Sequence, residues 1–208
     1  MTDADQPQIY LIAPSDLELS QFPDTLARVL DTHPIACLRL ALATRDESRI
    51  ARTADACREV AHARDVAIVL DTHFALVPQL GLDGVHLNDG ARSVRKARKA
   101  LGQDAIVGSY CAQSRHEGIS AGEAGADYVS FGPMGASPLD DGAQADPEIF
   151  AWWSEMIELP VVAVGALNAT LISALSPVTD FFAIGDEIWS DDDPALALTT
   201  LLSAMKQG

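Results

Sequence analysis

Charged side chains stand within or at the end of two short apolar runs, where each needs a partner or a ligand. Arg39 lies between two leucines in residues 35–42, and a charge in such a run should be paired or face a cavity. We therefore expect Arg39 to contact a ligand or to form a buried ion pair. Asp71 ends the next apolar run, and His73 follows two positions later, so both side chains can share one side of a strand. This pair predicts a metal or acid–base site, or else a helix N-cap formed by Asp71 or Thr72.

His86 interrupts a third apolar run, GVHL at residues 84–87, which Asn-Asp-Gly follows directly. We expect this histidine to be packed and hydrogen-bonded to a neighbour, with proton transfer or ligand contact as the alternative. Cys111 ends a further run, where a buried and unreactive cysteine is more common than a reactive thiol. The 3 cysteines form no C-x-x-C pair, so neither a disulfide framework nor a zinc site is expected.

Apolar runs alternate with helix-like segments along the whole chain. The pattern predicts strands at residues 8–14, 35–42, 66–71, 84–87, 105–111, 128–133, 160–166 and 181–186. Helical spacing or a helix-start proline follows each strand, as at Pro147 and Pro194. Such an alternation over 208 residues predicts an α/β fold, a single (β/α)8 TIM barrel domain spanning residues 1–208. A doubly wound open sheet is the main alternative, although no G-x-G-x-x-G follows the first strand.

The chain is strongly acidic, which limits its partners. Its formal net charge is −16 and its pI is about 4.4. Such a surface repels phosphate backbones and anionic lipids, so we expect neither a nucleic-acid nor a membrane partner. The sequence shows no secretory leader and no apolar run of about 18 residues, which predicts a cytoplasmic protein. A homo-oligomer is left open, with one of the tryptophans Trp152 and Trp153 as a candidate contact.

Several of these stretches, taken together, resemble the thiamine phosphate synthases and their thiazole tautomerase relatives. GLDGVHL is similar to the family's G-A-D-G-V-H-L strand, and AGADYVSFGP to its G-A-D-Y-[IV]-x-x-G-P stretch. LPVVAVGALN resembles P-V-V-A-I-G-G-I, CLRLA falls where the family has Q-L-R-x-K, and VLD falls where it has I-N-D. These matches occur in order and cover nearly the whole chain.

The resemblance implies a (β/α)8 barrel of thiamine biosynthesis that acts as a transferase. It would join hydroxymethylpyrimidine diphosphate to thiazole phosphate with Mg2+ and release pyrophosphate, so the expected partner is a small phosphorylated pyrimidine or thiazole ligand. The implied substrate-binding residues are Arg39, Ser109 or Tyr110, Gly132 and Asp140. The implied phosphate-binding residues are Gly165, Asn168 and Gly185, and the implied metal ligands are Asp71 and Asp89.

The chain departs from the family's pattern at several site positions. Cys37 and Ala41 replace the glutamine and the lysine that flank the family's arginine. NDGA at residues 88–91 replaces G-Q-x-D, so the second metal carboxylate is missing from its usual place. SPLD at residues 137–140 replaces T-x-T-K, and IGDE at residues 184–187 replaces the phosphate-binding turn V-S-A-I.

These departures change the charge expected at the barrel mouth. In the family reaction, negative charge grows on the leaving pyrophosphate, and cations stabilise it. In this chain, the cation expected at the mouth is Arg39, and the anions expected there are Asp71, Asp89, Asp140, Asp141, Asp186 and Glu187. We therefore expect reduced or altered synthase activity, with a non-catalytic or regulatory ligand-binding barrel as the alternative. A tautomerase activity is a minor third possibility, since no clear substitute replaces that relative's histidine after the fifth strand.

Overall fold

Parallel strands close into a barrel in the computed structural model, which describes residues 6–136 and 143–207. The strands are β1 (Gln8–Ile12), β2 (Ile35–Leu40), β3 (Ala67–Asp71), β4 (Gly84–Leu87), β5 (Ile106–Tyr110), β6 (Tyr128–Phe131), β7 (Val161–Val164) and β8 (Phe181–Ile184). Each strand pairs with the next along the chain, and β8 pairs with β1. The predicted (β/α)8 barrel and the position of every predicted strand are confirmed, and the open-sheet alternative is wrong.

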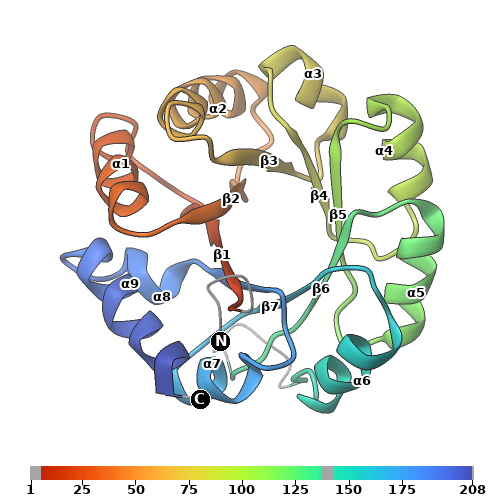
Figure 1. The fold of residues 1–208 in the computed structure, drawn as a ribbon. Coiled ribbons are helices and arrows are strands. Elements are labelled where there is room, and N and C mark those ends of the chain that lie inside the picture. The colour runs from red at the N-terminus through yellow and green to blue at the C-terminus, as the bar shows by residue number, and fades with distance from the viewer. Residues whose placement is uncertain (1–5, 137–142, 208) are drawn as a thin grey trace.

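Helices form a ring outside the strands (Figure 1). They are α1 (Phe22–Thr32), α2 (Glu47–His62), η2 (Phe74–Leu76), α3 (Val77–Leu80), α4 (Val94–Leu101), α5 (Arg115–Ala124), α6 (Glu148–Met156), α7 (Ala169–Leu175), α8 (Asp186–Trp189), α9 (Pro194–Leu202) and η3 (Ser203–Gln207). The short α8 was not predicted, because one turn shows no helical period. None of the helices in the described part of the chain has the length and apolar character that a membrane span requires.

The strands read as apolar runs because both of their faces are buried. Outward-facing side chains such as Leu11, Leu38 and Phe182 pack beneath the helices and are fully buried. One of the two tryptophans packs inward, as predicted. Trp153 is buried, and its indole N–H donates to the Leu159 carbonyl at 2.8 Å. Whether the partly exposed Trp152 marks an oligomer contact stays a prediction.

The inner faces of the strands enclose a polar cluster at the barrel centre. The hydroxyls of Tyr10 and Tyr128 lie 2.8 Å apart, and His86 Nδ1 lies 2.9 Å from the Tyr128 hydroxyl. The rings of His86 and Tyr128 are stacked, with centroids 5.6 Å apart. The prediction that His86 is packed and hydrogen-bonded to a neighbour is confirmed.

Gly108 makes room for this cluster. It lies opposite His86 in the β4–β5 register, and a Cβ at Gly108 would stand 2.0 Å from Tyr128 Cζ. A ring at that distance cannot stay in place, so any side chain at residue 108 would displace Tyr128 and break its hydrogen bonds.

We predict that G108A lowers the free energy of unfolding by about 1–3 kcal/mol, the usual range for overpacking a core. The matched control is G122A in α5, where a Cβ would stand 3.0 Å from the end of the flexible Leu159 side chain. Replacing a helical glycine by alanine gains up to about 1 kcal/mol, so G122A should be near neutral or stabilising. Urea unfolding followed by circular dichroism measures both, and equal stability of the two variants would contradict the packing described here.

Candidate active site

The carboxyl ends of β2, β3 and β4 bring Arg39, Asp71 and Asn88 into one hydrogen-bonded group. Arg39 Nε donates to Asp71 Oδ1 at 2.7 Å, and Arg39 Nη2 lies 2.5 Å from the same oxygen. Asn88 bridges the pair, since its Oδ1 accepts from Arg39 Nη2 at 3.1 Å and its Nδ2 donates to Asp71 Oδ2 at 2.6 Å. The side chains of Arg39 and Asp71 are only 12% and 20% exposed. The ion pair expected as one alternative for Arg39 is therefore present.

Arg39 also borders a cavity of about 370 Å³, which Asn88 and Tyr110 share. Arg39 could therefore also contact a ligand bound in this cavity. The predicted helix cap by Asp71 or Thr72 is wrong, since neither η2 nor α3 has a side-chain cap. Instead the Thr72 hydroxyl donates to Asp71 Oδ2 at 3.3 Å.

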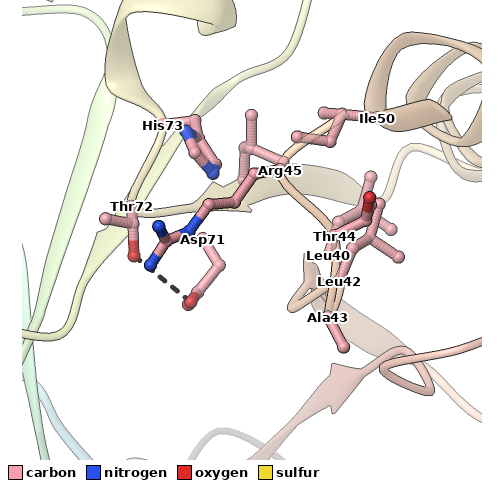
Figure 2. Close-up of a pocket in the computed structure, with 10 residues that line it drawn as sticks. Leu40, Leu42, Ala43, Thr44, Arg45, Ile50, Asp71, Thr72 and His73 are labelled. Carbon is pink, nitrogen blue, oxygen red and sulfur yellow. Dashed lines mark hydrogen bonds between the residues drawn. The ribbon is translucent and has the colours of Figure 1, made fainter. Parts of the chain in front are cut away.

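A second cavity, of about 340 Å³, lies between the ends of β2 and β3 (Figure 2). Its polar lining includes Thr44, Arg45, Asp71, Thr72 and His73. Figure 2 shows the Arg45 side chain extending from its loop toward Asp71 and Thr72. Arg45 is exposed, and no ion pair joins it to another residue within 6–136 or 143–207. The mouth therefore has a second cation.

Arg45 was missed by the sequence analysis. The signal that could have found it is its position in the loop after the Arg39 strand, because βα loops build the functional face of this barrel. His73 lines the same cavity, so the predicted proximity of Asp71 and His73 holds, whereas their predicted chemistry stays a prediction.

The two predicted metal ligands, Asp71 and Asp89, have different hydrogen-bond partners. The exposed Asp89 carboxylate accepts from the Ser93 hydroxyl at 2.6 Å, beside the start of α4. In the described ranges, no group of three or more His, Cys, Asp or Glu is arranged to hold a metal. Mg2+ in substrate complexes commonly takes one or two carboxylates and completes its shell with phosphates and waters. The donor set at Asp71 therefore fits Mg2+ that arrives with a diphosphate, and does not fit a resident metal.

Tyr110 and Ser109 point to opposite sides of β5. The Tyr110 hydroxyl donates to the Gly132 carbonyl at 2.7 Å and borders the mouth. Ser109 is fully buried on the helix side, where its hydroxyl donates to the Gly90 carbonyl at 2.8 Å. Tyr110 therefore faces the mouth and Ser109 faces away from it, and substrate contact by either residue stays a prediction. Asp140, also predicted to contact substrate, lies outside the described residues.

The loops after β7 and β8 hold the three predicted phosphate-binding residues. Gly165 has φ of 92° and borders the mouth, and its carbonyl accepts from the Met134 and Gly135 N–H groups. Asn168 instead caps α7, because its Oδ1 accepts from the Leu171 N–H at 3.0 Å. The Gly185 N–H donates to Glu187 Oε2 at 2.7 Å, so this predicted phosphate donor already has an anionic partner.

The charge at the mouth is better balanced than the sequence indicated. Asp71 is paired with Arg39, Asp89 accepts a hydroxyl, and Glu187 accepts backbone N–H groups. Arg45 adds a cation that was not counted. The expected acidic excess is therefore reduced by the Arg39–Asp71 pair and by Arg45, while no ion pair within the described residues joins Asp89, Asp186 or Glu187.

Two buried groups near the mouth are neutral at physiological pH. Burial lowers the pKa of His86 well below its usual value, and the nearby Arg39 guanidinium lowers it further. Burial raises the pKa of the Cys111 thiol to about 11. His86 is thus unsuited to donate a proton from a charged state, and the reactive-thiol alternative for Cys111 finds no support.

The fold and the site define the chain as a parallel (β/α)8 barrel whose polar site, with an arginine–carboxylate group, lies at the carboxyl ends of the strands, where barrels of this class carry their active sites. The chain belongs to the thiamine monophosphate synthase family, whose model matches residues 9–182.

Individual relatives agree with this assignment. The chain is 38% identical to the thiamine-phosphate synthase of Rhodospirillum centenum, over 99% of this chain and 100% of that protein. It is 36% identical to the protein of the same name from Erythrobacter litoralis, over 90% and 91%. Among solved structures, thiamine phosphate pyrophosphorylase from Pyrococcus furiosus superposes with a TM-score of 0.81 at 20% identity, covering 96% of each chain, which supports the fold.

The neutral state of His86 predicts a pH-dependent stability. Above about pH 6.5, His86 is neutral in both the folded and the unfolded chain, so its buried contacts contribute fully. As the pH falls below that value, only the unfolded chain takes up the proton, and the wild type loses up to about 1.4 kcal/mol per pH unit. The stability penalty of H86Q should therefore be smaller at pH 5.5 than at pH 7.5, by about 1 kcal/mol.

Urea unfolding of wild type and H86Q at both pH values measures this difference. H116Q is the control, because His116 is exposed on α5, and its effect should be small at either pH. A penalty for H86Q that does not change with pH would show that the histidine titrates alike in both states.

Proposed function

We propose that this chain joins a hydroxymethylpyrimidine diphosphate to a thiazole at the barrel mouth and releases pyrophosphate. The observation that carries the proposal is the Arg39–Asp71–Asn88 group beside a cavity that Arg45 also lines. Membership of the thiamine monophosphate synthase family supports the same reaction. Activity altered from that of an enzyme with the full family motifs is expected from the replacements at Ala41, Ala91 and Glu187.

The reaction asks for charge stabilisation and positioning. The lone pair of the thiazole nitrogen forms the new bond to the methylene carbon of the pyrimidine, and the electron pair of the breaking carbon–oxygen bond leaves with pyrophosphate. No proton moves in this exchange, so the site needs no general base, and a buried neutral His86 is compatible with it. The rate depends on donors aimed at the leaving group and on holding the two rings together.

Arg39 is placed to bind the leaving diphosphate. Asp71 and Asn88 hold its guanidinium at the rim until a ligand arrives. Arg45 supplies a second cation in the cavity beside Asp71. Ala41, at the family's lysine position, lines the cavity of Gly165 instead. Tyr110 and the apolar wall that includes Ile12 and Val164 border the space left for the thiazole ring.

Asp71 is the residue that would hold Mg2+. When bound, the ion neutralises charge on the diphosphate. Asp71 would then exchange one positive partner for another, and the released guanidinium of Arg39 would turn to the phosphate oxygens. The mutual pairing of Arg39 and Asp71 therefore keeps both groups in place until a ligand that suits both arrives.

A non-catalytic ligand-binding barrel remains the second candidate. It is favoured by the bonding of Asp89 to Ser93 and by the Glu187 carboxylate on the backbone donors after β7 and β8. Pyrophosphate release separates the two candidates directly. The purified chain, given both synthase substrates and Mg2+, should release pyrophosphate, although more slowly than an enzyme with the full family motifs; no release at all would favour the binding barrel.

Substitution of the two mouth arginines should lower the rate to different extents. R39A should reduce kcat/KM for the pyrimidine diphosphate by about 10²–10³, the usual effect of losing a positioned donor. R45A should reduce it by about tenfold, because Arg45 is exposed and its charge is partly screened. R52A is the matched control, since Arg52 is exposed on α2 outside the cavity, and its effect should stay within about twofold. Equal effects of R45A and R52A would exclude Arg45 from the site.

The two predicted metal ligands should respond differently to substitution. D71N should raise the Mg2+ concentration for half-maximal rate by about tenfold or more, since loss of a carboxylate ligand weakens binding of a hard cation. D89N should change it by less than about threefold, because that carboxylate is bound to Ser93. Magnesium titration of the steady-state rate measures both, and a larger shift for D89N would reverse the assignment.

A further inference from the structure

The Glu187 carboxylate bridges the loops that follow β7 and β8. Its Oε2 accepts from the Gly185 N–H at 2.7 Å, and its Oε1 accepts from the Leu167 N–H at 3.0 Å. Both carboxylate oxygens are therefore engaged, each by a backbone donor from a different loop. Hydrogen bonds to an ionised acceptor are stronger than neutral ones, so this arrangement holds the Glu187 side chain in place.

These donors belong to the corner where barrels of this class commonly bind phosphate. That site is formed by backbone N–H groups of the loops after the seventh and eighth strands. In this chain the same loops present their N–H groups to an anion that is part of the protein. A ligand phosphate could reach them only by displacing Glu187 and by leaving its carboxylate nearby, where two negative charges would repel each other.

The adjoining cavity, of about 670 Å³, carries no compensating cation. Its lining includes Ile12, Tyr110, Val164, Gly165, Asp186 and Glu187. No Lys or Arg lines it among the described residues. Arg39 borders an overlapping cavity, which shares Ile12, Tyr110, Pro133, Val164 and Gly165 with this one, and only β1 separates the strand of Arg39 from β8. The mouth therefore has a positive group at Arg39 and a negative group at Glu187.

We infer that Glu187 substitutes for the ligand phosphate, so that the second substrate of this site is a thiazole alcohol, the same ring with a free hydroxyl in place of the phosphate. The inference rests on the proposed function and specifies its second substrate. The bond changes are unaltered: the ring nitrogen bonds to the methylene carbon, and pyrophosphate leaves with the electron pair of the carbon–oxygen bond. The product is then an unphosphorylated thiazolium alcohol, whose positive ring suits an acidic cavity.

The test compares the thiazole alcohol with the thiazole phosphate. Binding of each to the wild-type chain is measured by isothermal titration calorimetry, and kcat/KM for each is measured by pyrophosphate release with saturating pyrimidine diphosphate and Mg2+. The wild type should prefer the alcohol by about tenfold or more in both measurements, since displacing charge-assisted hydrogen bonds opposes the phosphate.

Removing the carboxylate should open the corner to phosphate. E187A should bind and use the thiazole phosphate about 10- to 100-fold better than wild type, because the Gly185 and Leu167 donors become available. E187Q removes the charge and keeps the shape, so it should fall between the two and guards against misfolding of E187A. The matched control is D186N, which removes a neighbouring charge from the same cavity without releasing a backbone donor, and its gain should stay below about threefold.

The outcomes separate this inference from the proposed function. If the wild type binds the alcohol in preference to the phosphate and releases no pyrophosphate with either, the proposed reaction fails and the role of Glu187 stands. If the wild type binds or uses the phosphate at least as well as the alcohol, the inference is overturned, whether or not the reaction occurs. Equal gains for E187A and D186N, or no binding of either thiazole, would overturn it as well.

Discussion

The pairing of Arg39 with Asp71 is the interaction that organises the mouth of this barrel. Closure of a parallel sheet places the ends of β2, β3 and β4 side by side, and these ends supply Arg39, Asp71 and Asn88. Because the side chains of the pair are only 12% and 20% exposed, solvent screens their attraction weakly. The Asp71 carboxylate holds the Arg39 guanidinium at the rim, and the guanidinium holds the carboxylate, so both are in place for the diphosphate and Mg2+ that we propose as ligands.

The barrel interior supports this arrangement from below. Tyr10, Tyr128 and His86 form a buried hydrogen-bonded series, and Gly108 provides the space for it. Burial, and then the Arg39 guanidinium, lower the pKa of His86, which disfavours a second positive charge beneath the guanidinium. At the ends of β7 and β8, Glu187 is held by backbone donors of two loops. The charge of the mouth thus depends on Arg39, which also acts on His86, and on Glu187, which the loops after β7 and β8 hold in place.

The fold and half of the site were predictable from the sequence for the same physical reason. Buried parallel strands must be apolar, so the strands were visible as runs, and Arg39 and Asp71 stood out as charges within or at the end of them. Arg45 was not visible, because an arginine in a polar loop looks like any exposed charge. Ser109 and Tyr110 were left open, since a shift of one residue moves a side chain to the other face of a strand.

A count of charged residues in the sequence does not reveal what Glu187 contacts. The sequence shows a negative residue where the family binds phosphate, which reads as simple repulsion. It does not show that the N–H groups of Gly185 and Leu167 converge on that carboxylate, because the Leu167 contact joins loops 20 residues apart in the chain. The sequence also did not show the partners of two aspartates. The fold brings Arg39 to Asp71, and the turn after β4 brings Ser93 to Asp89.

The central claim is that the mouth has a cationic group for the diphosphate and an anionic group that excludes a second phosphate. A crystal structure of the wild-type chain grown with pyrophosphate and Mg2+ tests it most directly. The account predicts pyrophosphate against Arg39 and Arg45, with the Glu187 carboxylate still bound to the N–H groups of Gly185 and Leu167. Pyrophosphate bound to those N–H groups, with Glu187 turned away, would contradict it.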